Sequence, residues 1–112
     1  MSILHIHGRR DARVNPDGGP DARHPGLTGV GMIEGLELWA THMGATEQAN
    51  PKIPDACPSR VRARLWSTPD GQRVVGVLDP ELGHSWPDYM NDAVMRFIRN
   101  TPPRVSPPAP PL

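Results

Sequence analysis

Residues 82–88 read LGHSWPD and follow closely on the apolar run of residues 73–78, RVVGVL. His84 stands shortly after this run, between the flexible Gly83 and the conformationally fixed Pro87. A histidine in this position is presented by a loop rather than packed inside a helix or a strand. The stretch therefore predicts His84 in a loop between a strand and a helix.

A matching stretch lies near the start of the chain, where residues 3–11 read ILHIHGRRD. Residues 3–7 are mostly apolar and are bounded by Gly8, which is typical of a core strand. Asp11 follows Gly8 closely, where the end of a strand would hold a carboxylate at the edge of a sheet. A turn or capping aspartate is the alternative, and spacing alone favours it. Together, an acid after one strand and a histidine after a later one make up half of a catalytic site.

Hydrophobic periodicity predicts the remaining elements. They are a strand over residues 3–7, an amphipathic helix over 30–43, a hairpin with strands over 61–66 and 73–78, and a second helix from 88 or 89 to 100. This pattern predicts one α/β domain over residues 1–100. Residues 101–112 are rich in proline and are predicted to be a disordered tail.

Composition excludes several classes of protein. The chain has 112 residues, with 12 basic and 12 acidic side chains, so it lacks the positive surface that nucleic acids require. No apolar run approaches the roughly 20 residues of a membrane helix, and the N-terminus lacks the pattern of a signal peptide. The chain as written is expected to be cytoplasmic. Secretion is the alternative if an N-terminal segment is missing.

Three further side chains are weighed as site residues. His5 and His7 share one face of the predicted strand, which suits either a metal-binding pair or two core histidines with satisfied ring nitrogens. No other cluster at ligand spacing supports a metal, so no metal or other cofactor is expected. Cys57 precedes Pro58, which has no N–H to offer an oxyanion, so a structural thiol is favoured over a nucleophile.

A Ser-His-Asp site needs a serine to attack, a histidine to take and return its proton, and an acid to orient the histidine. In α/β-hydrolases the three come in the chain order serine, acid, histidine. Asp11 and His84 follow this order, but Ser2 is the one serine before Asp11, and no Gly-x-Ser-x-Gly elbow surrounds it. Ser85 adjoins His84, and neighbouring side chains diverge. The sequence therefore offers no convincing nucleophile.

At these residues the chain resembles a known family. LHIHGRRDARVNPDGG, followed by Gly-His-Ser-Trp-Pro, is similar to the C-terminal third of polyhydroxybutyrate depolymerases and feruloyl or acetylxylan esterases, also called LpqC-type esterases. The likeness covers about residues 3–100. Leu82 departs from the family pattern, which has glycine there, and Cys57 alone remains of the family's cysteines.

The resemblance implies a partial α/β-hydrolase, namely the C-terminal strands and helices of a doubly wound sheet. It implies a serine-type carboxylic-ester hydrolase in which His84 is general base and acid and Asp11 orients it. Trp86, in the same motif, is then a substrate-binding candidate, and the expected substrate is a polyester or an acylated polysaccharide. The first strand would lack its parallel neighbours and expose an edge, through which the chain could self-associate. The alternatives are an inactive truncated fragment and a small non-catalytic binding or dimerisation domain.

Overall fold

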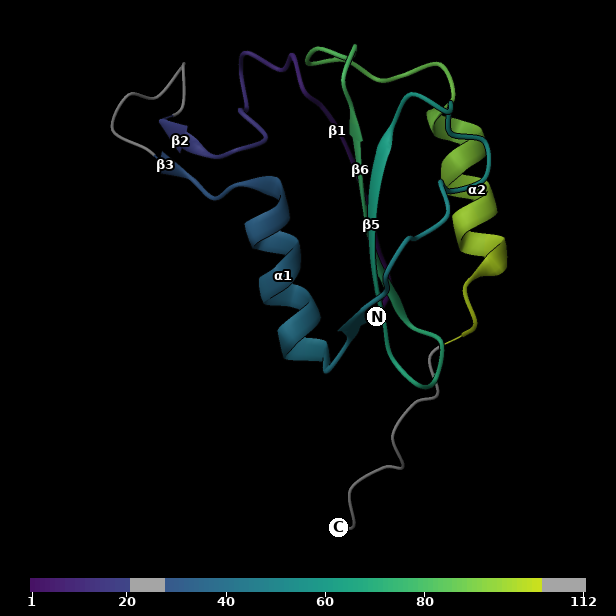
Figure 1. Cartoon of the computed structure of the whole chain (residues 1–112). Coiled ribbons are helices and arrows are strands. Elements are labelled where there is room, and N and C mark those ends of the chain that lie inside the picture. Colours follow the sequence, from purple (N-terminus) through teal and green to yellow (C-terminus); the bar gives the residue numbers. More distant parts are fainter. Residues whose placement is uncertain (21–27, 104–112) are drawn as a thin grey trace, which may run out of the picture.

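The computed structural model describes residues 1–20 and 28–103. The two strands that lead into the loops of Asp11 and His84 are parallel neighbours in it. The described part is a small mixed α/β domain, with a four-stranded mixed sheet between two helices (Figure 1). Its elements are β1 (Ile3–Gly8), β2 (Gly19–Pro20), β3 (Thr28–Gly29), α1 (Met32–Met43), β4 (Thr46–Glu47), β5 (Arg62–Ser67), β6 (Arg73–Asp79) and α2 (Met90–Asn100).

The sheet has the strand order β1-β6-β5-β4. β5 and β6 form the predicted antiparallel hairpin, with Arg62 opposite Leu78 and Ser67 opposite Arg73. β1 pairs in parallel with β6 from Ile3↔Val74 to Gly8↔Asp79. β1 is thus the terminal strand of the described sheet, as the exposed-edge prediction requires. The short strands β2 and β3 pair with each other away from this sheet.

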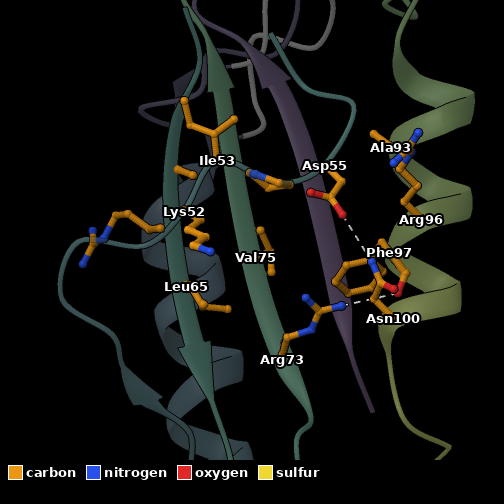
Figure 2. A pocket seen from close by; sticks show the side chains of 13 residues that line it. Lys52, Ile53, Asp55, Leu65, Arg73, Val75, Ala93, Arg96, Phe97 and Asn100 are labelled. Atoms are coloured by element: carbon orange, nitrogen blue, oxygen red, sulfur yellow. Dashed lines mark hydrogen bonds between the residues drawn. The ribbon is translucent and has the colours of Figure 1, made fainter. Parts of the chain in front are cut away.

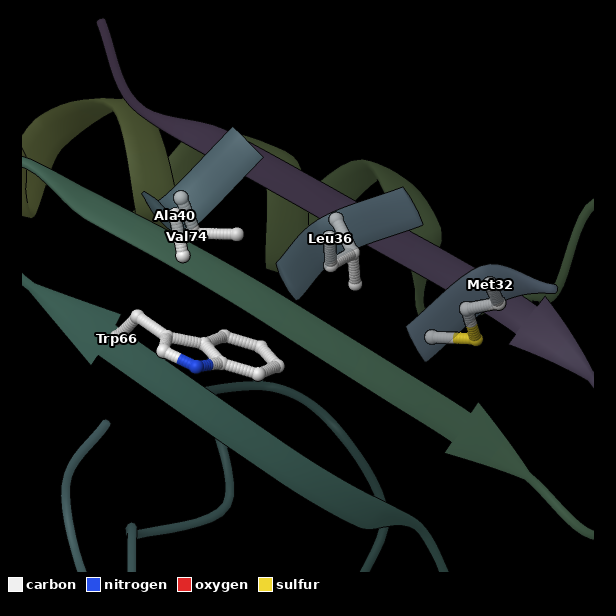
Figure 3. Packing of buried hydrophobic residues seen from close by; sticks show 5 residues of the cluster. All are labelled: Met32, Leu36, Ala40, Trp66 and Val74. Carbon is white, nitrogen blue, oxygen red and sulfur yellow. The ribbon is translucent and has the colours of Figure 1, made fainter. Parts of the chain in front are cut away.

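The face of the sheet toward α1 holds the larger apolar cluster. It consists of Met32, Leu36 and Ala40 from α1, Trp66 from β5 and Val74 from β6 (Figure 3). The α1 side chains fall four residues apart, which puts them on one face of the helix, as the periodicity predicted. Gly76 allows the close approach, because a Cβ there would lie 2.7 Å from Leu36 Cδ1.

The opposite face of the sheet is covered by α2 and the loop before β5. Here Val61, Val75 and Val77 are buried, and Tyr89 and Phe97 pack against them. The Arg73 guanidinium lies 4.6 Å from the centre of the Phe97 ring. The sheet is therefore apolar on both faces, which is the arrangement of a strand layer between helices.

The predicted elements are confirmed, with small shifts at their ends. α1 begins at Met32 rather than residue 30, because Gly31 is still extended (ψ 149°), and it ends at Met43, before Gly44 in the left-handed conformation (φ 69°). The start of the predicted tail packs on the domain, since Gln72 Nε2 donates to the Pro102 carbonyl at 3.2 Å. Residues 104–112 of that tail lie outside the described part.

Candidate active site

Two loops meet at the carboxyl ends of the parallel pair β1 and β6. β1 ends at Gly8 and leads to Asp11, and β6 ends opposite it at Asp79 and leads to His84. Both loops lie at the same end of the sheet in Figure 1. Crevices at the carboxyl ends of strands are where open α/β sheets bind ligands, so this end is the first place to look for chemistry.

The backbones of the two loops are joined directly. Arg9 N donates to the Asp79 carbonyl at 2.8 Å, and Arg10 N donates to the Leu82 carbonyl at 2.9 Å. This approach requires glycine at residue 8, because a Cβ there would lie 2.5 Å from Gly83 O and closer still to Leu82 O. The glycine that the sequence marked as a strand end thus also makes room for the histidine loop.

Asp11 and His84 are brought into contact. His84 Nδ1 and Asp11 Oδ2 are 2.8 Å apart, although 73 residues separate them in the chain. The other carboxylate oxygen, Oδ1, accepts the backbone N–H groups of Arg13 at 2.9 Å and Val14 at 2.8 Å. The Asp11 side chain is 6% exposed, whereas that of His84 is 47% exposed.

The surroundings of Asp11 favour its ionised form. Burial by itself would raise the pKa of Asp11, but hydrogen bonds from the Val14 amide, the His84 ring and the Arg13 amide outweigh it and lower that pKa. An ionised carboxylate can only accept, so the proton of this pair lies on His84 Nδ1. In the neutral ring His84 Nε2 is then an acceptor on a half-exposed side chain, as a general base requires.

The pair opens into a cavity of about 440 Å³. Ile6, Val14, Leu82, Trp86 and Met90 supply most of its apolar lining. Trp86 is 69% exposed, and its indole Nε1 donates to Asn91 Oδ1 at 3.3 Å. The third predicted site residue thus lines the same cavity as Asp11 and His84.

A buried carboxylate that the sequence did not single out supports the histidine loop. Asp79 is fully buried and accepts hydrogen bonds from Arg60 Nε at 2.9 Å and Arg60 Nη2 at 2.8 Å. The Tyr89 hydroxyl donates to it at 2.7 Å, and the Glu81 amide donates at 3.0 Å. Because residues 79 and 89 flank His84, this network ties the two ends of the histidine loop together.

The Asp79 network is electrostatically matched. The hydrogen bonds from Arg60 outweigh the cost of burial and lower the pKa of Asp79 to about 2. Burial and the bond to Asp79 raise the pKa of Tyr89, so the phenol keeps its proton and remains a donor. The sequence shows an aspartate before proline at the end of a predicted strand. Its partner Arg60 lies 19 residues earlier in another loop, and no local sequence pattern predicts their contact.

The other side chains weighed for catalysis are placed elsewhere. Ser2 Oγ donates to Gln72 Oε1 at 2.9 Å, at the opposite end of β1 from His84. Burial, followed by the nearby charge of Asp79, raises the pKa of the Cys57 thiol, which suits a structural role. In the described part of the chain no serine hydroxyl is hydrogen-bonded to His84.

His5 and His7 lie beside the acid on β1. His5 Nε2 and His7 Nδ1 are 3.0 Å apart, and His7 Nε2 is 3.3 Å from Asp11 Oδ2. Across residues 1–20 and 28–103, no group of three or more His, Cys, Asp or Glu side chains could hold a metal ion. Their ring nitrogens instead contact each other and the Asp11 loop.

A second cavity, of about 310 Å³, lies between α2 and the loop that holds Ile53 and Asp55 (Figure 2). Arg73 crosses it to donate to Thr101 Oγ1 at 2.8 Å, and Asn100 Nδ2 donates to Asp55 at 3.5 Å. Its cations are Lys52, Arg64, Arg73 and Arg96. It contains no paired acid and base, so the Asp11–His84 cavity is the better candidate for catalysis.

Comparison of the chain with protein-family models, with curated proteins and with solved structures finds no match. Neither helix in residues 1–20 and 28–103 has the length and apolar character needed to cross a bilayer. The structure itself defines the class of this chain. It is a small mixed α/β domain with an Asp–His pair at the carboxyl ends of two parallel strands.

Proposed function

We propose that this chain supplies the acid and the general base of a serine-type carboxylic-ester hydrolase. The observation that carries the proposal is the 2.8 Å contact between His84 Nδ1 and the ionised, buried Asp11, on a ring whose Nε2 is left free. An exposed histidine held by a buried carboxylate is the arrangement that acyl transfer to serine uses.

In the proposed reaction His84 Nε2 takes the proton of a serine hydroxyl as the oxygen attacks the ester carbonyl. Asp11 holds the ring in the required tautomer and stabilises the imidazolium that forms. His84 then returns the proton to the leaving alcohol. Water repeats the cycle on the acyl-enzyme and releases the acid. The nucleophilic serine belongs, in this proposal, to a segment additional to residues 1–112.

The fold proposed for the complete site is the α/β-hydrolase fold, of which this chain would be the C-terminal part. Support comes from the chain order of Asp11 and His84, which matches the order of acid and histidine in that fold. It also comes from the parallel pairing of β1 and β6, which places the two loops side by side. The outer edge of β1, which has no strand beside it in the described sheet, would take the next strand of the larger sheet.

The proposed substrate is a polyester or an acylated polysaccharide. The largely apolar cavity at His84 suits the acyl part of an ester, and exposed Trp86 offers a flat surface for a chain or a ring to lie on.

The test is ester hydrolysis by the full natural polypeptide that carries these residues, with p-nitrophenyl butyrate as substrate and a fluorophosphonate probe for the serine. Asp11→Asn and His84→Ala should each lower kcat by on the order of 10³-fold or more. His42→Ala, an exposed histidine near the end of α1, is the control and should leave the rate unchanged. Unchanged rates in both site variants would rule out the proposed roles.

A second candidate function is self-association through β1. It is favoured by the position of β1 at the end of the strand order, with one strand neighbour in the described sheet. Under this alternative the fluorophosphonate probe labels nothing, and the sedimentation coefficient rises with protein concentration. A polypeptide that is neither labelled nor associated would be the inactive fragment.

A further inference from the structure

His5 and His7 connect the sheet to the loop that bears Asp11. They lie two residues apart on one face of β1, with their ring centres 5.3 Å apart and their planes 25° from parallel. Ile3, on the same face, packs against the cluster beneath α1. The two imidazoles thus continue an apolar face toward the end of the strand that carries the site.

One fixed acceptor determines the protonation of both rings. His7 Nε2 lies 2.8 Å from the Val14 carbonyl oxygen, which can only accept, so His7 Nε2 carries a proton. In the neutral ring His7 Nδ1 is then an acceptor. His5 Nε2, 3.0 Å away, must be the donor to it. These tautomers are assigned from the hydrogen-bond partners.

The same His7 N–H also faces the acid. His7 Nε2 is 3.3 Å from Asp11 Oδ2, the oxygen that His84 Nδ1 approaches at 2.8 Å. Two hydrogen bonds hold the loop after β1 at Val14. The Val14 amide donates to Asp11 Oδ1 within the loop, and His7 on the strand donates to the Val14 carbonyl. The His7 side chain is 11% exposed.

We propose that His7, oriented by His5, is a positioning residue that fixes the Asp11 loop so that the Asp11 carboxylate meets His84. This inference rests on the proposed function of the Asp11–His84 pair. A core histidine would need only satisfied ring nitrogens, whereas His7 uses its one N–H on the backbone of the acid's own loop. Residues 9–18 contain no helix or strand, so the loop depends on such contacts for its shape.

The electrostatics of the cluster agree with a neutral His5 ring. Burial, followed by the charge that His7 can acquire, lowers the pKa of His5. With a donor on His7 Nδ1, His5 Nε2 would have to accept, so the direction of the bond between the two rings would reverse. The titratable groups of the described chain that meet here are His5, His7, Asp11 and His84.

The first measurement is ring-nitrogen NMR of the ¹⁵N-labelled chain. We expect both His5 and His7 as Nε2–H tautomers, together with a low-field, exchange-protected Nδ1–H proton on His84. An Nδ1–H tautomer at His7 overturns the inference without any variant, and it leaves the Asp11–His84 proposal intact.

The second measurement compares two substitutions of His7. His7→Gln keeps an N–H donor within reach of the Val14 carbonyl and should retain the low-field His84 proton. His7→Leu removes the donor and should lose that signal, as Asp11→Asn should. A folded His7→Leu chain that keeps the signal overturns the inference. Failure of the proposed function would appear elsewhere, as intact NMR signals in a polypeptide that hydrolyses no ester.

Discussion

Gly8→Ala tests whether the close approach of the two loops creates the acid–histidine pair. A Cβ on residue 8 would lie 2.5 Å from Gly83 O, whereas ordinary contact begins near 3.4 Å, so the histidine loop must retreat by about 1 Å. The obstructing atoms are backbone atoms, which cannot rotate aside as the end of a side chain can. Added to the 2.8 Å between His84 Nδ1 and Asp11 Oδ2, this retreat carries the pair beyond about 3.6 Å, where no hydrogen bond remains.

The assay for Gly8→Ala combines chemical unfolding with NMR of the His84 Nδ1–H proton. Forcing a methyl group into this contact should lower the free energy of unfolding by about 1 to 3 kcal/mol. The low-field His84 signal should disappear in the same variant. In the full natural polypeptide, kcat for ester hydrolysis should fall as it does in Asp11→Asn.

Gly83→Ala is the matched control, because it adds the same methyl group to the partner loop. The nearest atom to a Cβ there is Arg10 O at 3.9 Å, which is ordinary contact. Neither residue 8 nor residue 83 has a positive φ, so backbone strain does not distinguish the two changes. The reasoning is refuted if Gly8→Ala keeps the His84 signal, or if Gly83→Ala loses it to the same extent.

Two further predictions concern the elements that support the site. Asp79→Asn should remove an acid-dependent part of the stability. The folded-state pKa of Asp79, about 2, lies below its ordinary 3.8, so its contribution of about 2 kcal/mol is present above pH 4 and is lost as pH falls toward 2. Urea unfolding at pH 7 and at pH 2.5 should therefore show a smaller pH dependence in the variant, and an unchanged dependence would contradict the role of Arg60. Leu36→Ala should cost about 2 to 5 kcal/mol in the same assay, because Leu36 is 3% exposed in the cluster under α1, and a loss below about 1 kcal/mol would contradict that packing.

Local sequence patterns predicted the elements well, because they depend on local chemistry. Periodicity placed the strand at residues 3–7 and the helix at 30–43, within two residues of β1 and α1. The predicted end of the helix at residue 43 is confirmed, since Gly44, which follows it, adopts the left-handed conformation at little cost. Such signals are contained within a few neighbouring residues.

The contact between Asp11 and His84 was less accessible to sequence reasoning. It depends on the parallel pairing of β1 with β6, whose residues are about 70 positions apart, as in Ile3↔Val74. The pattern of apolar and polar residues within a strand does not identify the strand with which it pairs. The resemblance supplied an expectation of the pair, and the structure supplies the distance.

The supports of the pair were not predicted at all. Asp79 reads as a turn residue, and its burial follows only once Arg60 and Tyr89 surround it. His7 was weighed as a metal ligand or a core histidine, and its bond to the Val14 carbonyl depends on how the following loop folds back. Interactions of this kind form only in the tertiary structure, and no characteristic residue spacing in the sequence predicts them.

The two halves of the candidate site are held from opposite faces of the sheet. His7 lies on the α1 side and holds the Asp11 loop, whereas Asp79 lies on the α2 side and holds the loop of His84. Because side chains alternate along a strand, the two anchors lie on different faces of the sheet, and the loops that they hold are also joined by backbone hydrogen bonds. A chance surface ion pair would gain little from such support, since exposed pairs contribute at most about 1 kcal/mol. A catalytic pair gains a great deal, because its geometry must exist before substrate arrives. The placement of both anchors thus favours a site shaped for proton transfer.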